Sequence, residues 1–504
     1  MAKAVKQIWL GIDVGTSGLK ALAVDASGKT AARALVEYDM TAPRPGWAEQ
    51  DPGLWWSALK KAIGALKKKA RLDASLAGIG LTGQMHSSVF LDQGFKVIRP
   101  AILWCDQRPA QECEQLIEKI GFEQLVSLTL NRALTGFTLP KLLWLKGHEP
   151  ENYSRLRHLL VCKDYIRFRL TGELATEVSD ASGTLMFDVK NRKWSGELIE
   201  KLGIDPGILP RCFESPEITG RLTKDAANEL GLQPGAPVMG GGGDQAAGAV
   251  GNGIVEEGSV LISIGTSGVV FAAHNQPLLD PQARLHSFCH AAPGLWHSMG
   301  VMLSAGGSLR WLRETLREVK PGIDYSEMTR LAEKSPPGSH GLQFLPYLTG
   351  ERTPHFDPYA RGVFSGVSLK NGLGDLTRAV LEGVSFGLKD SVEIMKQCGV
   401  KTGKFYVSGG GAQSDFWSQM LADVLDARIF RLKVDEGPSF GAALLAMVGS
   451  KRFPDVGSAA RKTLKLRDSF EPKAKAARHY LELYQSWKTL YPALSARFKE
   501  MAGN

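Results

Sequence analysis

Short apolar runs at the start of the chain predict three β-strands. The runs cover residues 8–14, 19–25 and 30–38, and glycine-containing turns separate them. Strands joined by such short turns pair antiparallel, so we expect a meander. Apolar residues at helical spacing then predict a helix over residues 52–70, with Asp51 as its N-cap.

The second half of the chain repeats this pattern. Apolar runs predict strands over 259–264 and 268–273, and a later apolar helix starts at about Asp375. The turn between the strands reads "IGTSG" here and "VGTSG" in the first half, so that Thr16 aligns with Thr266. We therefore expect a duplicated domain, with the two copies facing each other across a cleft.

Two further glycine-rich segments interrupt the apolar pattern. Residues 237–253, "PVMGGGGDQAAGAVGNG", predict a strand, a glycine turn and a helix, with a flexible linker as the alternative. Residues 407–423 follow the same order and suit either a purine or ribose site or a plain strand-to-helix connection. "GIGLTG" at 78–83 matches a dinucleotide fingerprint, but strands lie on both sides of it and no helix follows.

The C-terminal segment from Pro472 onward predicts a helix that packs on the rest of the chain. Tyr480, Leu481, Tyr484 and Trp487 recur at helical spacing. A helix that binds a partner protein is the alternative.

Composition indicates a globular protein with more than one domain. A chain of 504 residues is too long for a single hydrophobic core. Its composition, 43% hydrophobic and 22% charged, is that of a globular protein. The net charge of +9 favours an anionic ligand such as a nucleotide over nucleic acid, because basic stripes with interleaved aromatic residues are missing from the sequence. Six cysteines without a C-x-x-C pair argue against disulfides and zinc. With neither a signal segment nor a run of ~18 apolar residues, we expect a soluble, cytoplasmic protein.

The repeated glycine turns carry the first chemical hypothesis. Backbone N–H groups in such a turn can converge on a phosphate, and Thr16 and Ser17 add hydroxyl groups. Asp13, just before the turn, can hold Mg²⁺ directly or through water. A single copy is more typical of an ordinary hairpin turn, but two copies favour a phosphate clamp.

A transfer reaction also needs a base. The second turn has Ser263 where the first has Asp13, so we look for the base elsewhere, and Asp244 in "GGGGDQ" is the candidate. Its alternative role is an N-cap for the helix that follows. His86 in "GQMHSS" is a candidate ligand, although a lone histidine is more often structural.

Taken together, these motifs resemble the FGGY family of carbohydrate kinases, within the actin, hexokinase and heat-shock ATPase superfamily. The resemblance covers residues 8 to about 448, and the motifs are most similar to those of bacterial members that phosphorylate D-xylulose. It rests on the order and spacing of "DVGTSG", "GWAEQDPGLWW", "GQMHSS", "RPAILWCDQR", "CKDYIRFRLTGE", "GGGGDQAAGAVG", "HSFCH", "FLPYLTGERTPH", "GVFSGVSLKNGLGDLTRAVLEG" and "GGGAQSDFW".

The resemblance implies an α/β fold with two actin-like or hexokinase-like ATPase domains. Each would have a ribonuclease H-like mixed sheet with helices, and the two would face each other across a cleft. We expect the N-terminal domain over residues 1–253, with the sugar site, the first phosphate turn and the catalytic aspartate. The C-terminal domain, residues 254–504, would hold the second phosphate turn and the adenosine site.

The resemblance also implies roles for individual residues. Asp244 matches the catalytic base and Asp13 the acidic residue near Mg²⁺, which is also counted as catalytic. Substrate-binding positions are Met85, His86, Asp244 and Gln245; nucleotide-binding positions are Thr16, Ser17, Gly265, Thr266, Trp311, Gly410 and Gly411. Gln245 and Cys105 stand where members acting on xylulose usually have asparagine.

The expected activity is therefore Mg²⁺-dependent transfer of a phosphoryl group from ATP to D-xylulose, in xylose and pentose catabolism. The alternatives are another ketopentose, a polyol or glycerol as acceptor, or a chaperone-like or actin-like ATPase. The expected partners are the sugar and ATP, with neither nucleic acid nor membrane, and a homodimer is an open alternative for its assembly.

Overall fold

A mixed seven-stranded sheet forms the centre of the N-terminal part in the computed structural model, which describes residues 7–70, 72, 76–433 and 436–502. Its strands follow the order β13-β14-β5-β1-β2-β3, with β15 beside β5. They are β1 (Ile8–Val14), β2 (Gly18–Asp25), β3 (Thr30–Glu37), β5 (Leu76–Gly83), β13 (Ile218–Arg221), β14 (Pro237–Met239) and β15 (Gly242–Gly243). The first three pair antiparallel, and β5 runs parallel to β1, so the predicted meander is confirmed.

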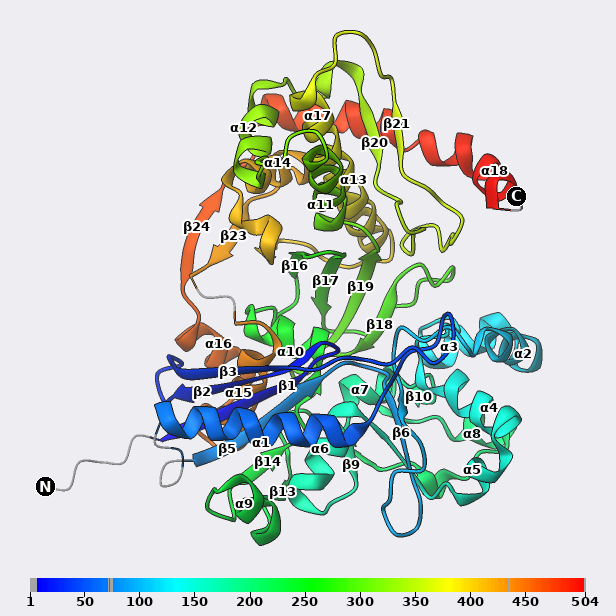
Figure 1. Cartoon of the computed structure of the whole chain (residues 1–504), viewed down its shortest axis with the longest axis vertical. Helices are drawn as coiled ribbons and strands as arrows, with labels where there is room; N and C mark the ends of the chain where they lie inside the picture. Colours follow the sequence, from blue (N-terminus) through cyan, green and yellow to red (C-terminus); the bar gives the residue numbers. More distant parts are fainter. Residues whose placement is uncertain (1–6, 71, 73–75, 434–435, 503–504) are drawn as a thin grey trace, which may run out of the picture.

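Helices cover both faces of this sheet (Figure 1). Helix α1 (Pro52–Lys69) packs on β2 and β3, and the Asp51 side chain accepts the N–H of Gly53 as its N-cap, as predicted. On the other face, α15 (Pro438–Gly449) lies directly against β1 and β5, with α10 (Asp244–Gly251) beside it. "GIGLTG" lies within β5, which confirms that it is not a dinucleotide-binding turn.

The second sheet repeats the scheme of the first. Its order is β18-β19-β17-β16-β22-β23-β24. Strand β16 pairs antiparallel with β17 and parallel with β22, as β1 does with β2 and β5. The strands are β16 (Ser259–Ile264), β17 (Gly268–His274), β18 (His286–Cys289), β19 (Trp296–Met302), β22 (Lys404–Ser408), β23 (Ile429–Leu432) and β24 (Leu466–Phe470).

Smaller elements complete the N-terminal part. A four-stranded sheet consists of β4 (Glu49–Gln50), β7 (Ala101–Ile102), β6 (Ser88–Leu91) and β8 (His158–Val161). Two strand pairs are β9 (Ala175–Glu177) with β12 (Arg211–Phe213) and β10 (Phe187–Asp188) with β11 (Lys193–Trp194). The helices are α2 (Ala110–Ile120), α3 (Phe122–Thr129), α4 (Thr138–His148), α5 (Pro150–Arg155), α6 (Cys162–Thr171), α7 (Val178–Ser182), α8 (Gly196–Leu202) and α9 (Lys224–Leu230).

The long, buried helix α13 (Leu373–Gln397) organises the second core. The other elements there are α11 (Gly306–Arg317), α12 (Tyr325–Lys334), α14 (Asp415–Leu425), α17 (Ala474–Trp487), α18 (Leu490–Ala502), β20 (Gln343–Leu345) and β21 (Val363–Ser365). In α17, Tyr480, Tyr484 and Trp487 are buried against this core, which confirms the predicted packing helix. Leu481, predicted in the same apolar stripe, is instead 48% exposed.

Two lobes result, and the chain crosses between them more than once (Figure 1). After β23, helices α15 and α16 (Val456–Thr463) return to the first sheet, and β24 then rejoins the second. The domain boundary between residues 253 and 254 stays a prediction. It would assign α15 and α16 to the C-terminal domain, although both helices pack on the first lobe. No helix among the described residues is long and apolar enough to cross a bilayer.

Candidate active site

A cavity of about 490 Å³ lies between the two halves of the chain. Its first-half lining includes Met85, His86, Trp104, Phe137, Asp244 and Gln245. Its second-half lining includes Ser267, His286, Phe288, Glu351 and Arg352. The structure thus brings four residues predicted to bind substrate, namely Met85, His86, Asp244 and Gln245, into one site.

Asp244 sits where β15 ends and α10 begins. Gly243 occupies the N-cap position and Asp244 is the first helical residue, so the alternative role of Asp244 as an N-cap is not the one observed. Burial raises the pKa of its carboxyl group to about 6, while hydrogen bonds from Gln245 act in the opposite direction. The group is therefore a carboxylate near neutral pH, and a stronger base than an exposed aspartate.

The glycine before Asp244 is required by packing. A Cβ atom on Gly243 would lie 2.9 Å from both Cγ and Sδ of Met85. Since Met85 lines the same cavity, any larger residue at position 243 would push it into the space for a ligand.

His86 is held in an unusual backbone conformation, with φ of 67°. Its carbonyl oxygen accepts a hydrogen bond from the buried Nζ of Lys141 at 2.9 Å, and its Nδ1 lies 2.7 Å from the carbonyl oxygen of Gly183. Because a carbonyl can only accept, Nδ1 carries the proton. Burial and the nearby Lys141 lower the pKa of the ring, so His86 is neutral and its Nε2 is an acceptor.

A second cavity, of about 920 Å³, belongs to the second half of the chain. Gly265, Thr266, Gly410 and Gly411 line it, together with Arg310 and Tyr325. Trp311 is not among its described lining residues, and its indole stacks on the Phe344 ring with the ring centroids 6.2 Å apart. The structure therefore does not bring Trp311 to the predicted nucleotide site.

The second phosphate turn lies where the two cavities meet. Thr266 lines the larger cavity and its neighbour Ser267 lines the smaller one, and residues 265–267 are exposed. A phosphate held by this turn would thus have access to both spaces.

The first phosphate turn is differently placed. Asp13, Thr16 and Ser17 are not among the described residues that line either cavity. The hydroxyl of Thr16 is already engaged: it accepts from Nε1 of Trp104 at 2.9 Å and donates to Oε1 of Gln84 at 3.1 Å. The predicted contact of Thr16 with phosphate would require it to leave these partners, whereas Ser17 is exposed.

Asp13 has the features expected of a residue near a cation. Its Oδ1 atom is buried and has no hydrogen-bond partner among the described residues. Burial and the negative charge of Asp244 raise its pKa to about 7, although Lys20 lowers it. No cluster of three or more histidine, cysteine or acidic residues suited to a metal occurs in the described part of the chain.

Several lining residues were not singled out from the sequence. Trp104 and Arg352 lie in motifs quoted for the family resemblance, and His286 and Phe288 come from "HSFCH". The motifs of the family resemblance were the only sequence feature that marked these residues. No local pattern distinguishes them from neighbours such as Cys105, which is not among the described lining residues.

Comparison with known proteins identifies the family of the chain. The family models for the N-terminal and C-terminal domains of the FGGY family of carbohydrate kinases match residues 8–251 and 260–450. A xylulose kinase of Lactococcus lactis is 41% identical over 96% of both chains. The crystal structure of a xylulose kinase from Rhodospirillum rubrum has a TM-score of 0.91 at 30% identity, covering 97% of this chain and 99% of that one. A gluconate kinase structure from Lactobacillus acidophilus reaches a TM-score of 0.92 at 27% identity, over 98% and 100% of the two chains.

Proposed function

The chain belongs to the FGGY family of carbohydrate kinases, and on that premise we propose that it phosphorylates D-xylulose at the C5 hydroxyl with ATP as donor. The sugar assignment is supported by xylulose kinases about 40% identical over nearly the whole chain. Such similarity favours a shared substrate more strongly than the fold does, since a gluconate kinase has an equally similar structure.

One observation carries the reaction type. The second phosphate turn lies between a cavity with a buried carboxylate base and a larger cavity lined by glycines and by Arg310. A sugar in the smaller cavity and a nucleotide in the larger one would meet at Ser267 and Thr266. Phosphoryl transfer depends chiefly on such positioning and on neutralisation of charge.

The residues of the acceptor cavity have separate roles in this proposal. Asp244 accepts the proton of the attacking hydroxyl group, while Nε2 of His86 accepts a hydrogen bond from another hydroxyl and fixes the sugar's orientation. Gln245 contacts the sugar beside the base. The half-buried guanidinium of Arg352 adds positive charge to the cavity.

Asp13 would hold Mg²⁺ together with the nucleotide. When bound, the ion neutralises charge on the phosphates. The unpartnered Oδ1 of Asp13 fits this role. The protein's own contribution is to keep this carboxylate close enough to Asp244 for the two charges to interact, so that donor and acceptor sites adjoin.

A chaperone-like or actin-like ATPase fits the structure less well. Such proteins have no need for a small-molecule cavity that contains a base, a neutral histidine and a half-buried arginine. We also propose action in the cytoplasm, supported by six free thiols, and assembly as a homodimer stays a prediction.

The test is Mg-ATP-dependent ADP release with D-xylulose, D-ribulose, L-ribulose, L-xylulose, glycerol and gluconate. We expect the highest kcat/KM with D-xylulose. A clear preference for another acceptor would overturn the sugar assignment and leave the kinase assignment in place. ADP release that ignores every acceptor but responds to a protein partner would overturn both.

A further inference from the structure

A buried segment behind the acceptor cavity links several of its walls. It comprises Glu177, the short helix α7 (Val178–Ser182) and Gly183. The Glu177 carboxylate caps α7 by accepting the backbone N–H groups of Ser179 at 2.8 Å and Asp180 at 2.9 Å. None of the residues from Glu177 to Ser182 is more than 3% exposed.

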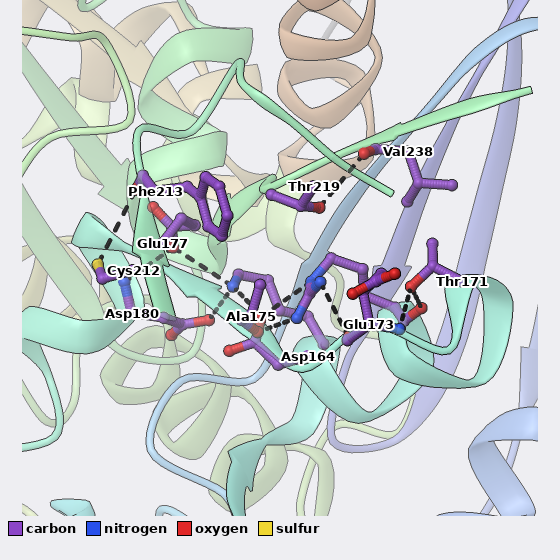
Figure 2. Close-up of polar contacts among 12 residues, drawn as sticks. Asp164, Thr171, Glu173, Ala175, Glu177, Asp180, Cys212, Phe213, Thr219 and Val238 are labelled. Carbon is purple, nitrogen blue, oxygen red and sulfur yellow. Dashed lines mark hydrogen bonds and ion pairs between the residues drawn. The ribbon is translucent and has the colours of Figure 1, made fainter. Parts of the chain in front are cut away.

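A buried lysine partly offsets the charge of this segment. Nζ of Lys163 lies 2.8 Å from Asp164, 3.1 Å from Asp180 and 3.4 Å from Glu177. Figure 2 labels these three acidic residues. Removing one member of such a buried cluster is costly because the others lose their compensation. The cluster therefore holds the acceptor oxygens of Glu177 at one position.

Two serines connect Glu177 to the glycine run before Asp244. The hydroxyl of Ser179 donates to Oε1 of Glu177 at 2.8 Å, and that of Ser215 donates to Oε2 at 2.7 Å. Since the proton of Ser179 is thus committed to the carboxylate, its oxygen is free to accept, and the backbone N–H of Gly243 donates to it at 2.9 Å. The carbonyl oxygen of Ser215 accepts the N–H of Gly241 at 2.9 Å.

The same segment anchors two other walls of the cavity. The carbonyl of Gly183 holds Nδ1 of His86, as described above. The hydroxyl of Ser182 accepts the backbone N–H of Cys289 at 3.0 Å, at the end of β18, the strand that carries His286 and Phe288. One buried element therefore contacts the glycine before Asp244, the ring of His86 and a strand of the second lobe.

We propose that Glu177 and Ser179 are positioning residues that hold Asp244 in place through the backbone N–H of Gly243. The inference rests on the proposed function, in which Asp244 is the base. Neither residue lines the cavity among the described residues, so their effect on the reaction is indirect, and the direct link to Asp244 is the backbone N–H of Gly243.

The first test is Ser179→Ala, which removes the acceptor for Gly243 but no cavity-lining group. We expect kcat to fall about ten-fold with KM for ATP unchanged, because small displacements of a reacting group cost one to two orders of magnitude. Hydrogen exchange in the peptide spanning residues 240–249 should become faster. A role in stability alone would not confine the change to that peptide.

Ser195→Ala is the matched control. Ser195 is also buried and caps α8 in the same lobe, where its hydroxyl accepts the N–H of Leu198 at 3.4 Å. It is not among the described residues that line the acceptor cavity. We expect this variant to lose stability without a change in kcat or in exchange over 240–249.

Ser215→Ala removes the other serine hydrogen bond to Glu177, in which the hydroxyl of Ser215 donates to Oε2. We expect kcat to fall about three-fold, and the double variant with Ser179→Ala to lose less than the product of the single effects, because both act through one carboxylate. If Ser179→Ala folds poorly, the kcat of Ser215→Ala and its hydrogen exchange over residues 240–249 still test the inference. Wild-type kcat and unchanged exchange over 240–249 in the folded variants would overturn the inference. Wild-type enzyme that turns over no sugar would instead overturn the proposed function.

Discussion

At the scale of single residues, Asp244 combines its proposed role as the base with a cost in stability. Its carboxylate lines the smaller cavity, and burial raises its pKa to about 6. The raised pKa means that folding disfavours the charged form. Asp244 therefore contributes less to the stability of the fold as the pH rises from about 4, the pKa of an unfolded aspartate, to about 6, its pKa in the folded protein.

Asp244→Asn separates these two effects. We expect turnover to fall at least ~10²-fold, since the amide cannot accept the proton, while the melting temperature at pH 7.5 stays the same or rises. Activity assays with the preferred sugar and thermal unfolding check this. ATP should still raise the melting temperature of the variant, which shows that the nucleotide site is intact. Near-normal turnover would contradict the assignment of Asp244 as the base.

The same carboxylate predicts a pH dependence. In the proposed mechanism, Mg²⁺ at saturating Mg-ATP would hold Asp13 in its charged form, which leaves Asp244 to titrate in the free acceptor site. We expect kcat/KM for the sugar to be constant above pH 7 and to fall about ten-fold per pH unit below pH 6. A profile that stays flat down to pH 5 would show that no carboxylate of raised pKa takes the proton.

The placement of residues in one cavity was predictable from the sequence where the candidates stand beside a glycine turn, whereas their roles stay predictions. Asp244, Met85, His86 and Gln245 each stand beside a glycine turn and share one cavity in the structure. Thr16 shows the limit of this approach. Its hydroxyl contacts Trp104 and Gln84, which are 88 and 68 residues away, and nothing in the local turn encodes those partners.

At the scale of elements, the docking of α17 is specified by a few large side chains. Trp487 is 1% exposed, donates from Nε1 to the carbonyl oxygen of Phe344 at 2.7 Å and packs on Phe386 of α13. The hydroxyl of Tyr480 lies within hydrogen-bond distance of both Arg378 and Glu382 on α13. These contacts tie the C-terminal helices to the core of the second lobe.

Trp487→Ala should therefore destabilise that lobe. We expect the free energy of unfolding to fall by about 3–5 kcal/mol, the usual cost of removing a buried tryptophan. Leu481→Ala is the control on the same helix, where a 48% exposed side chain should matter by less than about 0.5 kcal/mol. Denaturant unfolding followed by tryptophan fluorescence and by circular dichroism measures both. Equal losses in the two variants would contradict this packing.

The limits of helices and strands were predictable where the spacing of apolar residues agrees with the residue types of the adjoining turns. The strands of the two meanders and the start of α1 at Pro52 match the sequence prediction to within a residue, because glycine turns and an aspartate cap mark their limits. The exposure of Leu481 was not predictable, since helical spacing alone does not decide which neighbour in an apolar stripe faces the core.

At the scale of the whole molecule, the two halves repeat one sheet scheme, but α15 breaks the symmetry of the chain's path. This helix follows the second sheet in sequence and yet packs on β1, β5 and α10 of the first lobe. The sequence does not reveal this crossing. The contacts join residues near 11 and 80 to residues 439–443, and such pairs leave no periodic signal in either segment.

The glycines of "GIDVG" and "GIGLTG" acquire a packing role from this crossing. A Cβ atom on Gly80 would lie 1.9 Å from the carbonyl oxygen of Ala442, and one on Gly11 would lie 1.8 Å from that of Ser439. Both strands therefore present bare backbone to α15, which lets an apolar helix lie directly on the sheet. Since α15 also packs against α10, the placement of Asp244 depends on this contact.

Gly80→Ala tests whether α15 holds the two lobes in this arrangement. The added methyl group cannot fit without moving the helix backbone, so we expect stability to fall by at least about 1–3 kcal/mol and kcat to fall with it as α10 shifts. Gly64→Ala is the matched control, because nothing lies within 4 Å of a Cβ atom there and α1 should gain about 0.5–1 kcal/mol. Thermal unfolding and sugar-dependent ADP release measure both variants. Equal stability of the two variants would mean that α15 does not lie against β5, and the link from the C-terminal half to the catalytic helix would fail with it.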